Sequence, residues 1–136
     1  TSAAYESAPG VVAPYEQGKV SLPHGQEAAT DLIGLLEWEA REDLANFGSR
    51  MMLSDEALGE VCQDNILSDL CYHDPVLASD PKMWAGFVAE LSEAGVVSFS
   101  GRPKMEIVIF FVSKKSKQLR LIVDARRANR LFKPPP

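Results

Sequence analysis

The stretch "MEIVIFFVSKKSKQLRLIVDA", residues 105–125, decides the fold. Residues 105–112 form a β-branched and aromatic run of the kind that a buried strand needs. Residues 113–118 are polar, and residues 119–125 begin by alternating apolar with polar side chains. Two such runs on either side of a short polar connection predict an antiparallel β-hairpin with its lysines at the tip.

Helical periodicity precedes the hairpin. Thr30 is a candidate N-cap, apolar residues recur after it at roughly helical spacing, and Gly48 offers a stop, which together predict a helix near 31–46. Ser54 precedes two acidic residues and a second apolar face. This pattern predicts another helix, which ends before Pro75.

A third helix carries the most complete local signals. Asp80 is placed as an N-cap, Pro81 fits the first helical position, and Gly95 fits the C-terminal end. Beyond Gly95 the spacing changes, and residues 96–100 have the composition of a short strand. The chain is therefore expected to be α+β, with about three helices followed by an antiparallel β-hairpin and preceded by an extended N-terminal arm.

Composition divides the chain into four segments. Residues 1–28 are rich in Ser, Ala, Pro and Gly without periodicity, which is typical of a linker or of an extended arm that packs on a partner. Residues 29–78 form the expected helical region, and residues 79–133 the expected helix plus hairpin. Residues 134–136 are a proline tail, which continues neither a helix nor a central strand.

Length and composition place the chain among globular proteins. Its 136 residues are 46% hydrophobic and 24% charged, which suits one domain with a core of its own. No apolar run approaches the roughly 20 residues that span a bilayer, and residues 1–28 lack the pattern of a signal peptide. We therefore expect a soluble chain of unknown localisation, and its start at Thr1 indicates a processed product or a piece of a longer protein.

Charge is distributed very unevenly along the chain. Residues 1–100 hold 4 Lys+Arg against 17 Asp+Glu, a balance of −13, whereas residues 101–136 hold 10 against 2, a balance of +8. Such asymmetry indicates either a basic face for an anionic partner or an acidic part and a basic part that hold each other. Composition does not choose between these two interpretations.

The residues of the basic run resemble the fingers hairpin of reverse transcriptases from retroelement polyproteins. In that family a strand ending in Val is followed by lysines, a short turn, an apolar residue, Arg, a hydrophobic pair, Asp, Arg and Asn. The segment "FFVSKKSKQLRLIVDARRAN" has this order, and the matching residues are Val112, Lys114, Lys115, Leu119, Arg120, Ile122, Val123, Asp124, Arg126 and Asn129. Residues 84–100 resemble the helix and turn that lead into that hairpin, so the likeness covers about residues 80–133.

The resemblance implies a role for each charged residue. Lys114, Lys115 and Arg120 are expected to contact the phosphates of a nucleoside triphosphate, the lysines as point charges and the arginine as a planar fork. Asp124 and Arg126 are expected at the base of the hairpin, as a structural pair or a template-strand contact. The turn departs from the family in having Ser-Lys-Gln where Asp-Gly is usual, and Ala precedes Arg126 where an aromatic residue is common.

No catalytic residue and no metal ligand is assigned. Nucleotidyl transfer in this family depends on carboxylates that hold two Mg ions in a palm downstream of the hairpin, and no Tyr-x-Asp-Asp occurs in the sequence. We therefore expect no cofactor in this chain and no DNA synthesis by it alone. RNA-directed DNA polymerase activity is expected only if a parent chain continues into a palm. His24 and His73 lie at spacings that fit neither a catalytic triad nor a metal site.

Three functions stay open. The first is a fingers-like segment that contacts template and nucleotide, so that nucleic acid or a nucleoside triphosphate is the partner. The second is a non-catalytic structural or interaction subunit that docks, through its arm and basic tail, on a larger protein assembly. The third is nucleic-acid binding without polymerase ancestry, which the acidic first 100 residues disfavour because they repel phosphate.

Overall fold

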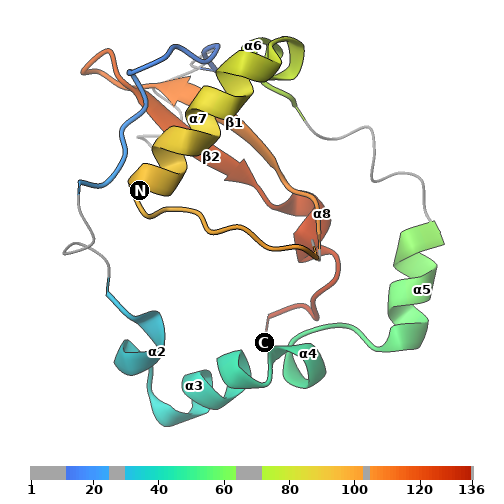
Figure 1. Ribbon diagram of the computed structural model, residues 1–136. Helices are drawn as coiled ribbons and strands as arrows, with labels where there is room; N and C mark the ends of the chain where they lie inside the picture. The colour runs from blue at the N-terminus through green and yellow to red at the C-terminus, as the bar shows by residue number, and fades with distance from the viewer. Residues whose placement is uncertain (1–11, 25–29, 64–71, 103–104, 136) are drawn as a thin grey trace.

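The computed structural model describes residues 12–24, 30–63, 72–102 and 105–135, with the backbone alone for Cys62 and Gln63. Within these residues the chain forms seven helices and one two-stranded antiparallel sheet (Figure 1), which confirms the expected α+β class. The helices are α2 (Leu32–Leu35), α3 (Trp38–Ala45), α4 (Phe47–Arg50), α5 (Asp55–Gln63), α6 (Pro75–Ser79), α7 (Pro81–Glu93) and α8 (Arg126–Asn129). The strands are β1 (Val108–Ser113) and β2 (Leu119–Asp124).

The predicted hairpin forms with one face toward the core. The strands pair from Val108 opposite Asp124 to Ser113 opposite Leu119. Phe111 and Leu119 are buried on the core face. Because side chains alternate across a strand, Arg120 lies on the opposite face.

Helix α7 follows the sequence signals closely. The carboxylate of Asp80 accepts hydrogen bonds from the backbone N–H groups of Lys82 and Met83 at 2.9 and 3.3 Å, and Pro81 occupies the first helical position. At the other end Gly95 adopts φ +70°, and the N–H of Val96 reaches back to the carbonyl of Leu91 at 2.9 Å. This is the hydrogen-bonded C-terminal cap that a glycine at this position favours.

The arm, defined as residues 12–24, is extended and pairs with both outer edges of the hairpin. Val12 bridges to Val112 on β1, and the N–H of Ala13 donates to the carbonyl of Phe111 at 3.0 Å. At the other edge Leu119 on β2 exchanges hydrogen bonds of 2.7 and 2.8 Å with the backbone of residues 19–21. The arm therefore covers edges that would otherwise expose unpaired backbone groups.

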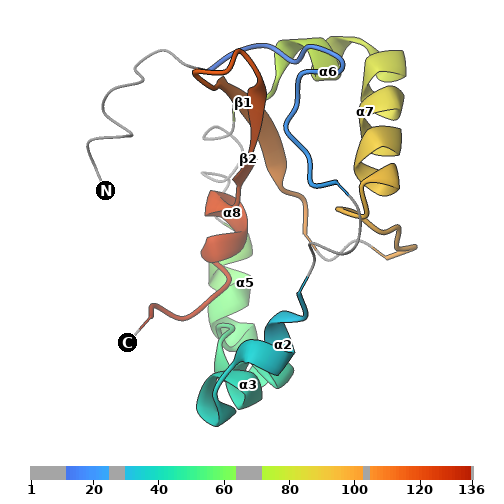
Figure 2. The same ribbon diagram turned by 90° about the vertical axis from the view of Figure 1, so that its left-hand side faces the viewer.

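The core lies between the hairpin, the arm and helix α7, and Figure 2 shows the arm running between the other two. Its centre is an aromatic trio of Tyr15, Phe87 and Phe111, whose ring centroids lie 5.0 to 5.4 Å apart in tilted or edge-to-face geometry. Leu77 of α6 and Leu91 of α7 complete the buried cluster together with Leu119. Burial, and secondarily the charge of Glu90, raises the pKa of the Tyr15 phenol.

The helix predicted near 31–46 is interrupted, and this expectation was wrong. Asp31, not Thr30, caps a single helical turn, and residues 36–37 are extended before α3 begins. The guanidinium of Arg41 donates to the carbonyl of Leu36 at 3.1 Å, which satisfies that group outside any helix. Gly48 ends no helix, because it lies inside α4.

The second predicted helix is described only in its first half. Helix α5 begins after Ser54 as expected, while residues 64–71 lie outside the described part of the chain. Helix α6 was not expected, although Asp74 and Pro75 repeat the cap signal of the next helix. The short strand expected over residues 96–100 is absent, because this segment is irregular and its apolar side chains are exposed.

Helices α2 to α5 form an arc that lies apart from the core in Figures 1 and 2. The end of the chain holds this arc through a short antiparallel contact in which Met52 bridges to Phe132. The N–H of Leu53 donates to the carbonyl of Leu131 at 2.8 Å, and that of Lys133 to the carbonyl of Met51 at 2.7 Å. We call this contact the 51–53/131–133 ladder.

Candidate functional site

The hairpin turn has a defined geometry that brings the cations together at its tip. The N–H of Lys114 donates to the carbonyl of Gln118 at 2.8 Å, and the N–H of Lys117 donates to the carbonyl of Lys114 at 3.0 Å. Lys117 has φ +64°, a left-handed conformation that glycine adopts more easily than lysine. The turn thus holds three lysines within four residues at the end of a two-stranded sheet.

Three cations near the tip are available to a ligand. Lys115 and Lys117 are exposed on the turn, and Arg120 is exposed on the face of β2 that points away from the core. Within the described residues these side chains form no hydrogen bond and no ion pair. The structure therefore does not use them to hold the acidic helices, which was one of the two interpretations of the charge asymmetry.

Lys114 differs from these three because the arm engages it. Its side chain is half-buried, and its Nζ donates to the hydroxyl of Ser21 at 2.8 Å. The same hydroxyl donates to Oε1 of Gln118 at 3.0 Å. Ser21 thus links the two ends of the turn and fixes the position of the Lys114 ammonium. One of the three N–H groups of this ammonium is used, and the other two stay available to an acceptor.

Asp124 and Arg126 form an ion pair at the base of the hairpin. Nε of Arg126 lies 2.8 Å from Oδ1 of Asp124, and one terminal nitrogen lies 2.6 Å from Oδ2. These hydrogen bonds from Arg126 lower the pKa of the buried Asp124 carboxyl below its ordinary value of 3.8, against the opposing effect of burial. The pair lies at the end of β2, where the backbone turns into α8.

Sequence reasoning missed Ser21 and Asp74. Asp74 is buried, and its carboxylate accepts hydrogen bonds from the N–H of Tyr15 in the arm and from the first turn of α6 at 2.9 to 3.0 Å. The Asp-Pro pair at residues 74–75 was a usable cap signal. No local pattern indicates the Ser21 contact, because its partner Lys114 lies 93 residues away.

An open hollow of about 620 Å³ lies beside the tip, between the arm and the C-terminal end of α7. Its lining includes Ser21, His24 and Gln118, and also the carboxylates of Glu90 and Glu93. These two acids disfavour a phosphate in the hollow. An anion is better received on the side of the hairpin that carries Lys115, Lys117 and Arg120.

No group of three or more His, Cys, Asp and Glu side chains is placed to hold a metal ion in the described part of the chain. No helix of the same residues is both long and apolar enough to cross a membrane.

No protein-family model, no curated protein and no solved structure matches the chain.

Proposed function

We propose that the hairpin tip binds the phosphates of single-stranded nucleic acid or of a nucleoside triphosphate, as expected of a segment that resembles the fingers of a reverse transcriptase. The observation that carries the proposal is a set of exposed cations at the tip that have no hydrogen-bond or ion-pair partner among the described residues. Lys115, Lys117 and Arg120 supply charge to an anion, and Lys114 adds a fixed ammonium group beside them. The proposal concerns binding and assigns no catalytic residue.

The geometry favours a phosphate chain over a compact anion pocket. Lys115, Lys117 and Arg120 are exposed, and none of them lines the hollow between the arm and α7. Exposed lysines act on a phosphate mainly through charge, so we expect binding that depends strongly on salt and weakly on base sequence. Arg120 adds a planar donor fork, which suits two oxygens of one phosphate.

Titration of a fluorescent single-stranded oligonucleotide at low and moderate salt tests this function. We expect wild-type chain to bind, with a slope of log Kd against log salt of about two if three phosphate contacts form. Replacing Lys115, Lys117 and Arg120 together by Ala should remove most of the affinity and most of this slope. Inorganic triphosphate, added as a competitor, should displace the oligonucleotide if the same cations bind both.

The matched control removes the same charge elsewhere. Lys82, Arg102 and Lys133 are exposed cations outside the hairpin, and their side chains form no hydrogen bond or ion pair within the described residues. The triple Ala variant at these positions should keep most of the binding. Equal losses in the two triple variants, or no binding by the wild-type chain at low salt, would contradict the proposed site.

The second candidate function is that of an interaction subunit in a protein assembly. The observation that favours it lies in α2 and α3, where large apolar side chains are exposed. This surface is separate from the hairpin tip, so the two functions are compatible within one chain (Figure 1).

A further inference from the structure

The described residues of the arc of helices α2 to α5 include no buried side chain. None of residues 30–61 is buried, and α2, α3 and α4 are 4, 8 and 4 residues long. Helices this short are marginal in water unless an apolar face packs against another element. The exposed apolar side chains of this arc are therefore an unusual feature that calls for a partner.

The most exposed apolar part of the arc is a stretch of seven residues. Its large side chains are Leu32, Ile33, Leu35 and Trp38, with 59%, 48%, 69% and 74% of their surface exposed. We call these four residues the α2–α3 surface. A large aromatic side chain beside leucines is the composition of an energetic centre in protein interfaces.

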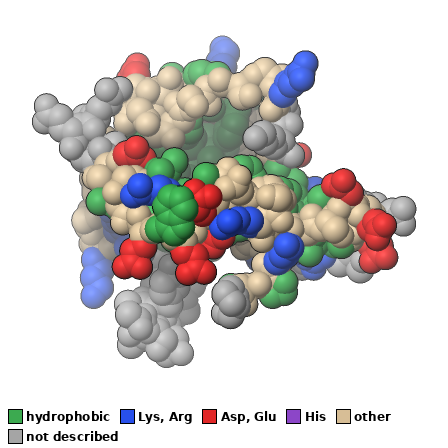
Figure 3. Space-filling view, turned by 90° about the horizontal axis from the view of Figure 1, so that it is seen from below, with side chains coloured by type: hydrophobic (Ala, Val, Ile, Leu, Met, Phe, Trp, Pro, Cys, Tyr) green, Lys and Arg blue, Asp and Glu red, His purple; other side chains and the backbone are tan. Residues whose placement is uncertain are grey.

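Acidic residues neighbour the α2–α3 surface in the sequence. Asp31 precedes it and Glu37 and Glu39 flank Trp38, while no Lys or Arg occurs in residues 30–40. The carboxylates of Glu37 and Glu39 form no hydrogen bond or ion pair with the described residues. Figure 3, which views the molecule from below, shows hydrophobic and acidic side chains next to one another on this side.

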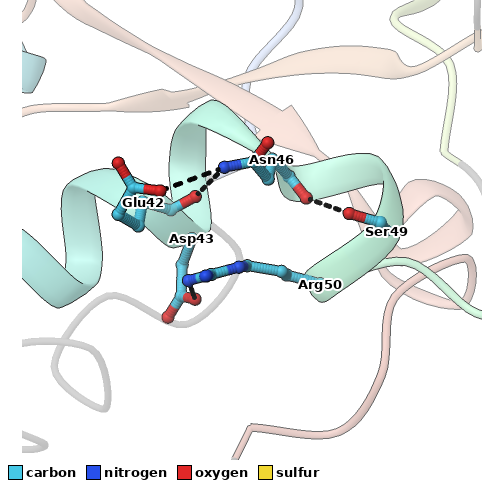
Figure 4. Close-up of polar contacts among 5 residues, drawn as sticks. All are labelled: Glu42, Asp43, Asn46, Ser49 and Arg50. Carbon is cyan, nitrogen blue, oxygen red and sulfur yellow. Dashed lines mark hydrogen bonds and ion pairs between the residues drawn. The ribbon is translucent and has the colours of Figure 1, made fainter.

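The nearest cations in sequence are already engaged. Arg41 donates to the carbonyl of Leu36, and Arg50 forms an ion pair with Asp43 at 3.1 Å across the α3–α4 junction. In the same junction the side-chain amide of Asn46 donates to the carbonyl of Glu42, as Figure 4 shows. Neither arginine pairs with Glu37 or Glu39, so within the described residues these two carboxylates are left for a cation of a partner.

We propose that the α2–α3 surface binds a cationic, amphipathic segment of another protein. Apolar side chains of that segment would cover Leu35 and Trp38, and its Lys or Arg side chains would meet Glu37 and Glu39. A second copy of this chain docking through the same surface is disfavoured, because it would place these acids against their own equivalents. The charge beside the apolar residues therefore selects a basic partner rather than self-association.

Fluorescence of Trp38 tests the proposal in the full chain. In a Trp84→Phe background Trp38 is the only tryptophan, and its exposed indole should shift to shorter emission wavelength when it is covered. The probe is an amphipathic helical peptide of about 18 residues, or about five turns, with Leu on one face and Lys on the other. We expect a saturable blue shift that weakens as salt rises, and no shift with the same peptide carrying Glu in place of Lys.

Two variants locate the contact. Glu37→Lys with Glu39→Lys should weaken peptide binding at least about tenfold, because it reverses the charge around Trp38. Glu56→Lys with Glu60→Lys makes the same charge change on α5 and should leave the affinity nearly unchanged. Isothermal titration of the Leu35→Ser variant with the peptide measures the apolar contribution to binding without relying on the tryptophan. Circular dichroism checks that this variant folds like the parent chain.

Three outcomes would overturn the proposal. The first is a saturating Lys peptide that leaves the Trp38 emission unchanged. The second is equal binding of the Lys and Glu peptides, or equal losses in the two charge-reversed variants. The third is a blue shift of Trp38 with rising protein concentration alone, accompanied by dimers in sedimentation, because a second copy would then be the occupant.

Discussion

Asp74 connects two parts of the chain that are 59 residues apart, the arm at Tyr15 and the start of helix α6. Its buried carboxylate accepts hydrogen bonds from three backbone N–H groups and pairs with no cation of the described residues, so its role is to satisfy donors. Backbone donors that are buried without an acceptor are costly. This residue therefore helps to hold the arm beside the aromatic trio, in addition to the backbone pairing of the arm with the hairpin edges.

We predict that Asp74→Ala destabilises the chain more than Asp80→Ala does. Loss of the cap at α6 should cost about 1 kcal/mol, as should loss of the exposed cap at α7. Asp74→Ala should cost a further 1–3 kcal/mol or so, because the N–H of Tyr15 then lacks its acceptor. Denaturant unfolding followed by circular dichroism measures both, and equal losses would show that the arm gains nothing from Asp74.

A second prediction at this scale concerns Asp124. Arg126 holds the folded pKa of this carboxyl below its ordinary value of 3.8, so the pair stabilises the fold above that pH. The contribution is lost as pH falls through the folded pKa, where the carboxylate takes up a proton. Asp124→Asn should therefore melt below wild type at neutral pH, and the gap should close as pH falls below 3.8 through the folded pKa. A gap that is constant over this range would contradict the assignment.

At the scale of the element, the hairpin turn contains one unfavourable backbone conformation. Lys117 has φ +64°, and the left-handed region costs a non-glycine residue about 1 kcal/mol. Lys117→Gly should raise the free energy of unfolding by up to about 1 kcal/mol. Lys115→Gly removes the same charge where the described φ is not positive, and should lower it by about 0.5–1 kcal/mol. Thermal melts of both variants measure the difference, and a loss in both would contradict this turn geometry.

The elements that could be predicted are those whose sequence signals, such as caps, turn residues and apolar runs, lie within or next to the element itself. Helix α7 has its cap, proline and terminal glycine within residues 80–95, and the hairpin has two apolar runs joined by a polar turn. The break between α2 and α3 follows no such pattern. The helical spacing of apolar residues continues across residues 36–37. However, no side chain there is buried, so packing does not stabilise a continuous helix, and Arg41 donates a hydrogen bond to the carbonyl of Leu36.

At the scale of the whole molecule, contacts between distant segments were beyond prediction. The cations at the tip could be recognised in the sequence, whereas the support of Lys114 by Ser21 and the pairing of the arm with both hairpin edges could not. These contacts join residues about a hundred positions apart. The backbone of an extended segment can form hydrogen bonds with another strand whatever its local sequence, so the sequence does not indicate the partner. The 51–53/131–133 ladder is of the same kind.

This ladder yields a prediction for the arc of helices. Truncation after Arg130 removes both hydrogen bonds of the ladder, so amide exchange over residues 38–53 should accelerate at least about tenfold. Exchange in α7 should stay slow, because the core cluster contains no residue of the arc. Truncation after Lys133 keeps the ladder and serves as the control. Mass spectrometry of exchanged peptides would contradict this division if α7 and the arc lost protection together.

The most direct measurement of the central claim is a nuclear magnetic resonance titration of the ¹⁵N-labelled full chain with a single-stranded oligonucleotide of about 10 nucleotides. If the exposed hairpin cations form the phosphate site, the amide resonances of residues 113–120 should shift progressively with added oligonucleotide and return as salt is raised. Those of α2 to α5 should stay in place, because their acidic side chains repel the strand. No shift at low salt, or shifts that leave residues 113–120 unchanged, would contradict the account.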